Sequence, residues 1–502
     1  MASSLVLISI SLLFLYLFNL VKKQYNYFKD RGIPNPKPIF PLGNFWGVGL
    51  SVHFIHRVNE IYRQFKGKAK ICGFFVTTIP AYIALDIELI KNILVKDFDS
   101  FHDRGIYYNE KADPLSAHIF SIAGEQWKTL RQKMTTTFSS GKIKAMMPTL
   151  NKISEEMTEV LGEYADEGKT LNYRDMASRL MCEIVGEIAF GIKCNALRDP
   201  NCEMMVLSDF LSIKDMKQRV MYLFSNAFPE VCRKLNIQIT PKDVQHYFLK
   251  IINEAIEYRE KNKIRRNDYF DMLLQLKNEG KLDGDVTNVG RISHTDMLAA
   301  CFVFFVAGFE TSSTALAYAL YELAVNQELQ DRTRDEIEKV LSNYDGKVTY
   351  EALMNMNYPG QVISESLRKY TPGNVLMRKC TKEYKIPDTD IVIEKGRMVF
   401  LPMHAIHNDP EYFPDPEKFD PDRFSPEMEK ERNPFTFLPF GEGMRICMGL
   451  RFGLIQTRLG LVSVLRKYRV TLNEKTVHPI RLDPKDVTMM PYGGIWLNTE
   501  HI

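Results

Sequence analysis

The sequence predicts a mainly α-helical fold with small β-sheets, organised as one large body behind an apolar N-terminal segment. Apolar residues recur at helical spacing through the middle of the chain, whereas runs with strand character are short. No internal repeat and no second linker divides the 502 residues. The composition, with 45% hydrophobic and 25% charged residues, excludes collagen-like, disordered and disulfide-scaffold proteins.

The charge balance argues against nucleic-acid binding. The 65 Lys and Arg residues are matched by 62 Asp and Glu residues, so the whole molecule has no field that attracts a polyanion. The eight cysteines include no CxxC pair, which argues against a zinc site. Scattered thiols are typical of a chain that folds in a reducing compartment.

Residues 1–21 carry no charge and are long and apolar enough to cross a bilayer as a helix. We therefore expect an N-terminal transmembrane signal anchor. The alternative is a cleaved secretory signal, but a basic start and small residues at a cleavage site are both missing. Because the nearby positive charges, beginning with Lys22 and Lys23, all follow this segment, the positive-inside rule places the body in the cytoplasm.

Residues 22–44 are basic and rich in proline. Prolines at positions 34, 36, 38 and 41 fix φ and prevent a helix, which predicts a semi-rigid linker. The globular body is then expected over residues 45–502.

Helices are expected over residues 150–162, 180–190 and 247–261, where apolar residues recur at helical spacing. Residues 410–439 contain many prolines and are expected to form an ordered meander without regular structure.

Strands are expected in two places. Residues 70–85 have strand character that Pro80 interrupts, and residues 391–393 and 398–401 are expected to be joined by a turn at Gly396.

The strongest signal for function is FGEGMRICMG at residues 440–449, where three glycines, Arg445 and Cys447 precede an apolar helix. Glycines let a backbone approach a flat ligand closely. The N-terminal end of the helix and the charge of Arg445 both favour a thiolate, which is a ligand for a soft metal. The alternative is that Cys447 is simply a small buried apolar residue.

This segment resembles the heme-binding loop of the cytochromes P-450, FxxGxRxCxG, at every fixed position. Met444 stands where a proline is common in that family. The resemblance implies the cytochrome P-450 fold with heme b as cofactor and Cys447 as the axial thiolate ligand of the heme iron. It also implies that Phe440, Gly441 and Arg445 lie against the heme.

A long helix is expected over residues 293–323, opened by a capping box at residues 293–296. Residues 307–311 read AGFET, and on spacing alone a Gly and a Thr in a helix usually mean close helix packing. The segment matches the AGxET of the family's oxygen-binding helix. The resemblance implies that Thr311 and Glu310 are catalytic and deliver protons within a site that excludes water.

Glu365 and Arg368 form an ExxR pair on one helix face, where opposite charges can interact. Such a pair alone is usually a solvated surface contact. In the family this pair joins an arginine of the meander, here Arg423, in a buried network. Its implied role is structural.

Trp127 and Arg131 are spaced i and i+4, so both face the same side of a helix. The purely structural alternative is a tryptophan in the core beside an arginine at the surface. The resemblance assigns this WxxxR helix, with Arg445 and Arg378, to the heme propionates, because buried carboxylates need cationic donors. Arg104 is a further candidate.

The resemblance extends over the whole chain and is greatest with the insect microsomal branch that handles plant toxins and insecticides. It implies a membrane-bound monooxygenase on the cytoplasmic face of the endoplasmic reticulum. Such an enzyme inserts one oxygen atom from O2 into lipophilic substrates, namely plant toxins, insecticides or endogenous lipids. Two alternatives remain: a peroxide isomerase of the same fold, against which the intact Glu310 and Thr311 pair argues, and a non-catalytic carrier of heme or lipophiles.

Electrons must come from another protein, because no Gly-rich dinucleotide motif follows any expected strand. The resemblance implies NADPH as the source, through NADPH-cytochrome reductase, with cytochrome b5 as a second donor. A basic face complementary to an acidic partner is expected on the cysteine side of the heme. Its residues are Lys128, Lys133, Lys142, Lys144 and Arg451.

Substrate contacts are expected in segments rich in Phe, Met and Leu, although such clusters are more often plain core. The resemblance points to residues 107–120 and 204–247, Phe302, Phe305, Val375, Leu376 and the turn at residues 489–493.

Overall fold

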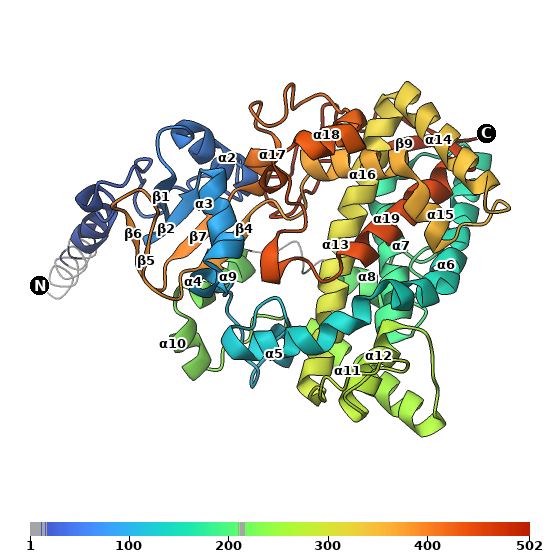
Figure 1. Cartoon of the computed structure of the whole chain (residues 1–502), viewed down its shortest axis with the longest axis horizontal. Coiled ribbons are helices and arrows are strands. Elements are labelled where there is room, and N and C mark those ends of the chain that lie inside the picture. Colours follow the sequence, from blue (N-terminus) through green and yellow to red (C-terminus); the bar gives the residue numbers. More distant parts are fainter. Residues whose placement is uncertain (1–11, 13–15, 17, 209, 211–215) are drawn as a thin grey trace, which may run out of the picture.

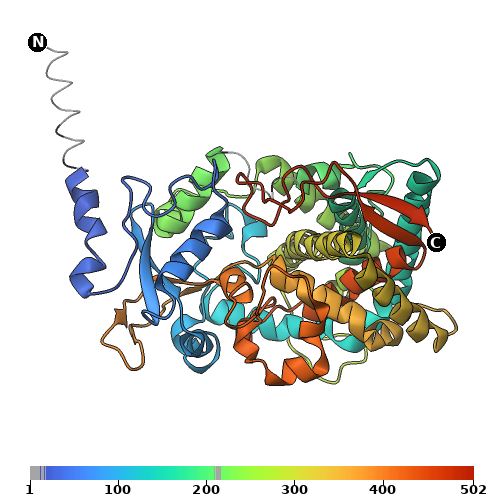
Figure 2. The ribbon, with the colours of Figure 1, turned by 90° about the horizontal axis from the view of Figure 1, so that it is seen from above.

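A computed structural model describes every residue of the chain except 1–11, 13–15, 17, 209 and 211–215. The predicted class is confirmed, since helices form most of the body and the sheets are small. The largest sheet lies near the N-terminal end of the molecule and the helical part lies beyond it (Figure 1). Most of the expected anchor at residues 1–21 falls outside the described residues. Residues 18–25 are helical and lie at the edge of the body (Figure 2).

The α-helices are spread along the whole described chain. They are α2 (Phe54–Phe65), α3 (Ile87–Lys91), α4 (Phe98–Phe101), α5 (Gly124–Thr135), α6 (Ser140–Asp166), α7 (Tyr173–Val185), α8 (Glu203–Ser208), α9 (Met216–Ala227), α10 (Pro229–Lys234), α11 (Lys242–Asn262), α12 (Tyr269–Asn278), α13 (His294–Val325), α14 (Gln327–Ser342), α15 (Tyr350–Asn355), α16 (Asn357–Lys369), α17 (Met403–His407), α18 (Pro426–Glu431) and α19 (Leu450–Leu465).

The strands form three sheets in the described part of the chain. The first has the order β1-β2-β7-β4, with β1 (Ile71–Val76), β2 (Ile79–Ala84), β7 (Met398–Leu401) and β4 (Leu376–Lys379). The second has the order β3-β9-β8, with β3 (Leu171–Asn172), β9 (Trp496–His501) and β8 (Tyr468–Leu472). The third pairs β5 (Tyr384–Lys385) with β6 (Val392–Ile393).

The long helix α13 crosses the middle of the molecule and packs against α7, α16 and α19 (Figure 1). Its predicted capping box is confirmed, because Asp296 N donates to Ser293 Oγ at 3.0 Å and Ser293 N donates to Asp296 Oδ2 at 2.9 Å. Within the described residues it is also the helix that is long and apolar enough to span a membrane. Its burial inside the body identifies it instead as a core helix.

The three helices predicted in the middle of the chain are confirmed in α6, α7 and α11, with one local difference. After Val185 the backbone widens into a π-helical turn, η5 (Gly186–Phe190), so the predicted helix does not keep one geometry to its end. Residues 410–439 form a meander interrupted only by short turns of helix, as predicted.

The predicted break at Pro80 is wrong. β1 and β2 form a hairpin whose turn lies at Thr77 and Thr78, and Pro80 stands inside β2 opposite Phe75. β7 pairs with β2 only at Tyr82 and Ile83, so no third strand needs an N–H group from Pro80.

The two strands predicted on either side of Gly396 are confirmed, with a turn at Lys395 and Gly396 between them, but they belong to different sheets. Residues 392–393 form β6, which pairs with β5, whereas residues 398–401 form β7, which pairs with β2 and β4. The N–H of Gly396 donates to the carbonyl of Cys380 at 2.7 Å, and the chain passes there from one sheet to the other.

Part of the expected linker packs on the body. Tyr27, Phe28 and Ile33 are buried in the same hydrophobic cluster as β1 and β2. A Cβ added at Gly73 would lie 2.3 Å from the ring of Phe28, so the ring occupies the space that this glycine leaves. Residues 22–44 therefore include a docked segment as well as the proline-rich stretch.

Candidate active site

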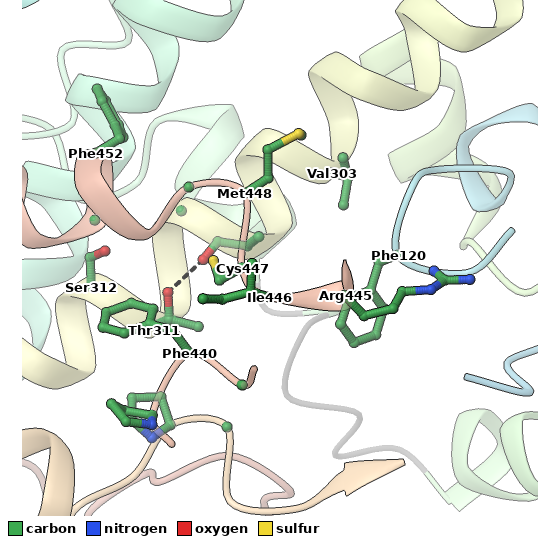
Figure 3. A pocket seen from close by; sticks show the side chains of 18 of the residues that line it. Phe120, Val303, Thr311, Ser312, Phe440, Arg445, Ile446, Cys447, Met448 and Phe452 are labelled. Carbon is green, nitrogen blue, oxygen red and sulfur yellow. Dashed lines mark hydrogen bonds between the residues drawn. The ribbon is translucent and has the colours of Figure 1, made fainter. Parts of the chain in front are cut away.

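A cavity of about 310 Å³ lies between α13, α5, β4 and the loop at residues 440–449 (Figure 3). Its walls are mainly apolar. Phe440, Gly441, Arg445 and Cys447 of the loop line it together with Thr311 of α13. The structure thus brings to one cavity residues that the sequence places far apart.

The loop is held in a tight turn before α19. Cys447 N donates to Phe440 O at 2.9 Å, which closes the turn, and α19 begins at Leu450 directly after it. Gly443 has φ of 73°, and an added Cβ would lie 2.3 Å from Leu94 O, so no larger residue fits there. Met444, which replaces the more common proline, is exposed and packs little.

Cys447 is exposed to the cavity rather than to bulk solvent. Burial raises the pKa of its thiol, while the N–H of Gly449 and the charges of Arg104 and Arg131 act in the opposite direction. We expected Arg445 to supply the positive charge that favours the thiolate. In the structure Arg104 and Arg131 supply it instead. A cationic ligand at the sulfur would add to the stabilisation of the thiolate.

Arg445 is held away from the sulfur by a set of backbone carbonyls. Its Nε donates to His102 O at 2.8 Å, its Nη2 donates to Ile122 O at 3.1 Å, and its guanidinium lies 3.8 Å from the ring centroid of Trp127. Asp103 is the nearby acid, 3.7 Å from Arg445 Nη2. Burial lowers the pKa of Arg445 to about 9, against the opposing effect of Asp103.

Three further arginines reach the same cavity. Arg131 Nη2 donates to Ile446 O at 2.9 Å, and Arg104 Nη2 donates to Arg445 O at 3.2 Å. Arg378 Nη1 donates to its neighbour's carbonyl at Met377, at 2.9 Å, while its buried Nε has no hydrogen-bond partner. Burial lowers the pKa of Arg378 to about 10 and that of Arg104 well below its usual range.

The cavity therefore has a strong excess of positive charge. Arg104, Arg131, Arg378 and Arg445 line it, and none of its described lining residues is Asp or Glu. Of these four arginines only Arg445 has an acidic neighbour among the described residues, Asp103 at 3.7 Å. Buried cations without a counter-charge are costly, so the site calls for an anionic ligand. An apolar slot with a sulfur on one wall and cations at its edge fits heme b, whose iron takes a thiolate and whose two carboxylates take arginines.

Thr311 lies on the α13 wall, and its hydroxyl faces the cavity (Figure 3). Its Oγ1 donates to Ala307 O at 2.6 Å, one turn earlier in the helix. Gly308 lines the cavity beside it, and the carbonyl of Gly308 accepts from Gln456 Nε2 at 3.2 Å. At this point the cavity wall therefore presents the Thr311 hydroxyl beside a glycine that has no side chain.

Glu310, predicted as the partner of Thr311, is turned toward α7 and is not among the lining residues of this cavity. Its Oε1 lies 2.6 Å from Arg174 Nη2, and the two side chains are 15% and 4% exposed. Arg174 also donates to Ser313 Oγ at 3.0 Å. The sequence offered no signal for Arg174, because an arginine early in a helix usually faces solvent.

The ExxR pair lies behind the site and is fully buried. Arg368 Nε donates to Glu365 Oε2 at 2.6 Å, and Arg368 Nη2 donates to Glu365 Oε1 at 2.9 Å. Arg423 Nε lies 3.5 Å from Glu365 Oε1, without hydrogen-bond geometry. Arg368 Nη1 donates to His407 O at 2.9 Å, so the pair connects α16 to α17 before the meander.

A second cavity of about 580 Å³ adjoins the first, and Phe120 lines both. Tyr107 and Phe302, two of the expected substrate contacts, line it. Phe305 instead packs against Phe248 at 4.9 Å between ring centroids and lines neither cavity in the described part of the chain. The same holds for the turn at residues 489–493, where Met489 O accepts from the hydroxyl of Tyr318.

Comparison with known proteins agrees with this geometry. The chain matches the family described as Cytochrome P450 over residues 34–498. It is 40% identical to Cytochrome P450 6A1 of Musca domestica over 486 residues, which cover 96% of this chain and 95% of that protein. It is 39% identical to Cytochrome P450 6a9 of Drosophila melanogaster over 488 residues, 97% of each chain. It is also 39% identical to Cytochrome P450 6a2 of Drosophila melanogaster over 506 residues, 99% of each chain.

Proposed function

Because the chain belongs to the cytochrome P450 family and is therefore a heme-thiolate monooxygenase, we propose that its substrates are lipophilic organic compounds. Plant toxins, insecticides and endogenous lipids are the classes that fit. The observation that carries the proposal is the cavity in which Cys447 and Thr311 share apolar walls. Such walls favour a substrate that gains more from burial than from hydration.

We assign Cys447 as the thiolate ligand of the heme iron and Arg131, Arg378 and Arg445, with Trp127, as the surroundings of the propionates. Phe440 and Gly441 would lie against the macrocycle. When bound, heme b supplies the redox chemistry that activates O2 with electrons from NADPH. The chain's own contribution is to hold this group, exclude water and place the substrate.

Thr311 is the residue proposed to hold a proton at the reacting end of the cavity, through Oγ1. Its O–H bond, which donates to Ala307 O, has to rotate away from that carbonyl before it can donate to a group in the cavity. Glu310 is proposed to supply protons from behind the helix wall. Its hydrogen bond from Arg174 must then loosen during turnover, because Glu310 does not line the cavity in the described structure.

NADPH-cytochrome reductase is the proposed electron donor, with cytochrome b5 as a second. α5 supports this assignment because it carries Trp127 and Arg131 on the cavity side and Lys128 on its outer side, where the lysine side chain is 51% exposed. Lys144 on α6 is 47% exposed and pairs with Glu351. The proposed basic face is completed by Lys133, Lys142 and Arg451.

Charge reversal tests the docking surface. Lys128→Glu with Lys133→Glu is expected to slow reduction by the reductase, since complementary charge mainly accelerates association. Turnover driven by added peroxide needs no donor and should be unchanged. Equal loss of both activities would refute the assignment.

The proposed location is the cytoplasmic face of the endoplasmic reticulum membrane. Residues 1–21 would be the anchor, residues 22–44 the connection that partly packs on the body, and residues 45–502 the catalytic domain. The uncharged run at residues 1–21 supports this arrangement.

Reconstitution with reductase and a lipophilic probe tests the function itself. We expect product formation that requires NADPH and O2 together. Conversion of an added hydroperoxide without either would identify a peroxide isomerase. Tight binding of the probe without consumption of NADPH would identify a carrier.

A further inference from the structure

The second cavity combines an apolar wall with two cations. Phe302 and Val306 of α13 supply the apolar wall. Lys217, near the start of α9, and Lys242, the first residue of α11, also line the cavity. Tyr222 of α9 lines it between them in the sequence. A ligand that fills this space therefore meets both hydrocarbon and positive charge.

The two lysines have no counter-charge inside the cavity. None of its described lining residues is Asp or Glu. His118, which also lines it, adds no charge at neutral pH, because burial and the nearby Arg104 lower its pKa to about 4. α11 begins at Lys242, so the N–H groups of its first turn add positive potential at the same place. The cavity therefore favours an anion.

Two acids close to this wall do not take the place of such an anion. Asp113 is buried behind the wall, where its Oδ2 accepts from Thr240 N at 2.8 Å and from Ile239 N at 3.2 Å. Its Oδ1 is 3.4 Å from Gln245 Nε2, which donates to it. Asp243, in the first turn of α11, is exposed and lines neither cavity. The charge of each carboxylate thus lies outside the cavity.

Tyr222 supplies a neutral hydrogen-bond donor at the same cavity. Its backbone is held in place, since its carbonyl accepts from Asn226 Nδ2 at 2.7 Å. Its hydroxyl forms no hydrogen bond with a described residue, and burial raises its pKa. The phenol therefore keeps its proton at neutral pH and can donate to an anion. Because a buried hydroxyl without a partner is costly, Tyr222 points to a ligand that accepts a hydrogen bond.

The two cavities meet at Phe120 and along α13. Phe120 lines both, and Val303, the neighbour of Phe302 on α13, lines the first (Figure 3). Their volumes of about 310 and 580 Å³ are each typical of a ligand pocket. Heme fits the first cavity, so the second is the space left for most of a substrate whose apolar end reaches toward Thr311.

We propose that the second cavity selects lipophiles with a carboxylate at one end, such as long-chain fatty acids, and that Lys217, Lys242 and Tyr222 hold this head group. The inference rests on the proposed function and narrows its substrate class. The lysines act as point charges, whereas the phenol adds a directional hydrogen bond. The hydrocarbon chain then lies along α13, past Phe302. A neutral lipophile of equal length gains only the burial of its chain.

Binding to the heme-loaded full chain in detergent tests this assignment. Laurate and methyl laurate have the same acyl chain but differ in charge, and equilibrium dialysis of the radiolabelled compounds gives Kd for each. We expect laurate to bind at least about tenfold more tightly than the ester at low salt. This difference should shrink at high salt, because salt screens charges that solvent reaches. Equal Kd values for acid and ester in the parent protein would overturn the proposal.

Variants separate the head-group contacts from the rest of the cavity. Lys217→Gln with Lys242→Gln should weaken laurate binding by at least about tenfold but change the Kd of methyl laurate by less than about twofold. Tyr222→Phe should weaken laurate binding by about threefold or more. Lys250→Gln removes an exposed lysine of α11 that lines neither cavity, and this matched control should bind laurate as the parent does. Equal weakening of acid and ester in the double variant would overturn the proposal, as would weaker laurate binding in the control.

Failure of this inference differs from failure of the proposed function. The measurement is product formation from laurate and from methyl laurate with reductase, NADPH and O2. A parent protein that binds and oxidises both compounds equally well remains a monooxygenase of lipophiles but has no carboxylate site. A parent protein that prefers laurate in dialysis but oxidises no lipophile keeps the carboxylate site and contradicts the proposed function.

Discussion

Arg174 of α7 and Glu310 of α13 form an ion pair with 2.6 Å between Nη2 and Oε1. Both side chains are largely buried, so each charge depends on the other for compensation. The pair ties α7 to the helix that carries Thr311. A residue expected to face the reacting end of the cavity is therefore also part of the contact between two core helices.

Arg174→Met is expected to lower the free energy of unfolding by about 2–4 kcal/mol, because it leaves the Glu310 carboxylate buried without its partner. The double variant Arg174→Met, Glu310→Met should be less destabilised than the sum of the single variants. Urea unfolding of the heme-loaded protein measures all three. If the losses in the free energy of unfolding of the two single variants simply add in the double variant, the pairing of Arg174 with Glu310 is contradicted.

Thr311→Ala removes the cavity hydroxyl. Product formation should fall by about tenfold or more, because the proposed proton donor at the reacting end is lost. Consumption of NADPH should fall much less, so the ratio of product to NADPH drops. Thr311→Ser keeps a hydroxyl and serves as the control. An unchanged ratio in Thr311→Ala would remove Thr311 from the proposed proton path.

Arg378→Met should stabilise the protein without heme but weaken its binding of heme. Without heme, Arg378 is a buried cation with an unpaired Nε, so its replacement should raise stability. With heme, the same change removes a proposed propionate donor, so heme should dissociate faster. The melting temperatures of the protein with and without heme measure the effect on stability, and heme transfer to apomyoglobin measures the rate of heme dissociation. A loss of stability in both forms would argue against a ligand at this position.

Because of the lowered pKa of Arg378, the stability of the protein without heme should depend on pH. Burial lowers this pKa to about 10 in the folded chain without heme. The unfolded chain then binds more protons at high pH than the folded chain does, so stability without heme should rise as pH increases from about 9 toward 12. Arg378→Met should flatten this rise, which chemical denaturation at several pH values would reveal.

Glu365→Gln should be among the most destabilising single changes. It leaves Arg368 as a fully buried cation, at a cost of about 3–5 kcal/mol in the free energy of unfolding. Lys385→Ala, which breaks an exposed pair with Asp390, is the control and should change stability by less than about 0.5 kcal/mol. Similar effects of the two substitutions on urea unfolding would count against the buried network.

The sequence predicts the parts of the site that have strict local spacing. The 440–449 loop and the AGFET segment are each continuous in the sequence, so the residues of the first share one turn. Those of the second lie on one helix, where Glu310 and Thr311 take different faces. The capping box at Ser293 and Asp296 is equally local. These features appear in the structure where they are expected, except that Glu310 does not line the cavity.

Contacts between distant segments could not be predicted in the same way. Arg174 and Glu310 meet only because α7 packs on α13. The strand pairing of residues 398–401 likewise depends on β2, far away in the sequence. Periodicity locates elements, whereas their partners follow from three-dimensional packing.

The identity of the atom that holds the heme iron is the most direct test. The full-length protein and its Cys447→Ser variant are loaded with heme, reduced, and exposed to carbon monoxide, with Cys232→Ser as the matched control. The parent and the control should give the Soret band of a thiolate-ligated complex, and Cys447→Ser should lose it. An unchanged band in Cys447→Ser would contradict the assignment of the sulfur at position 447.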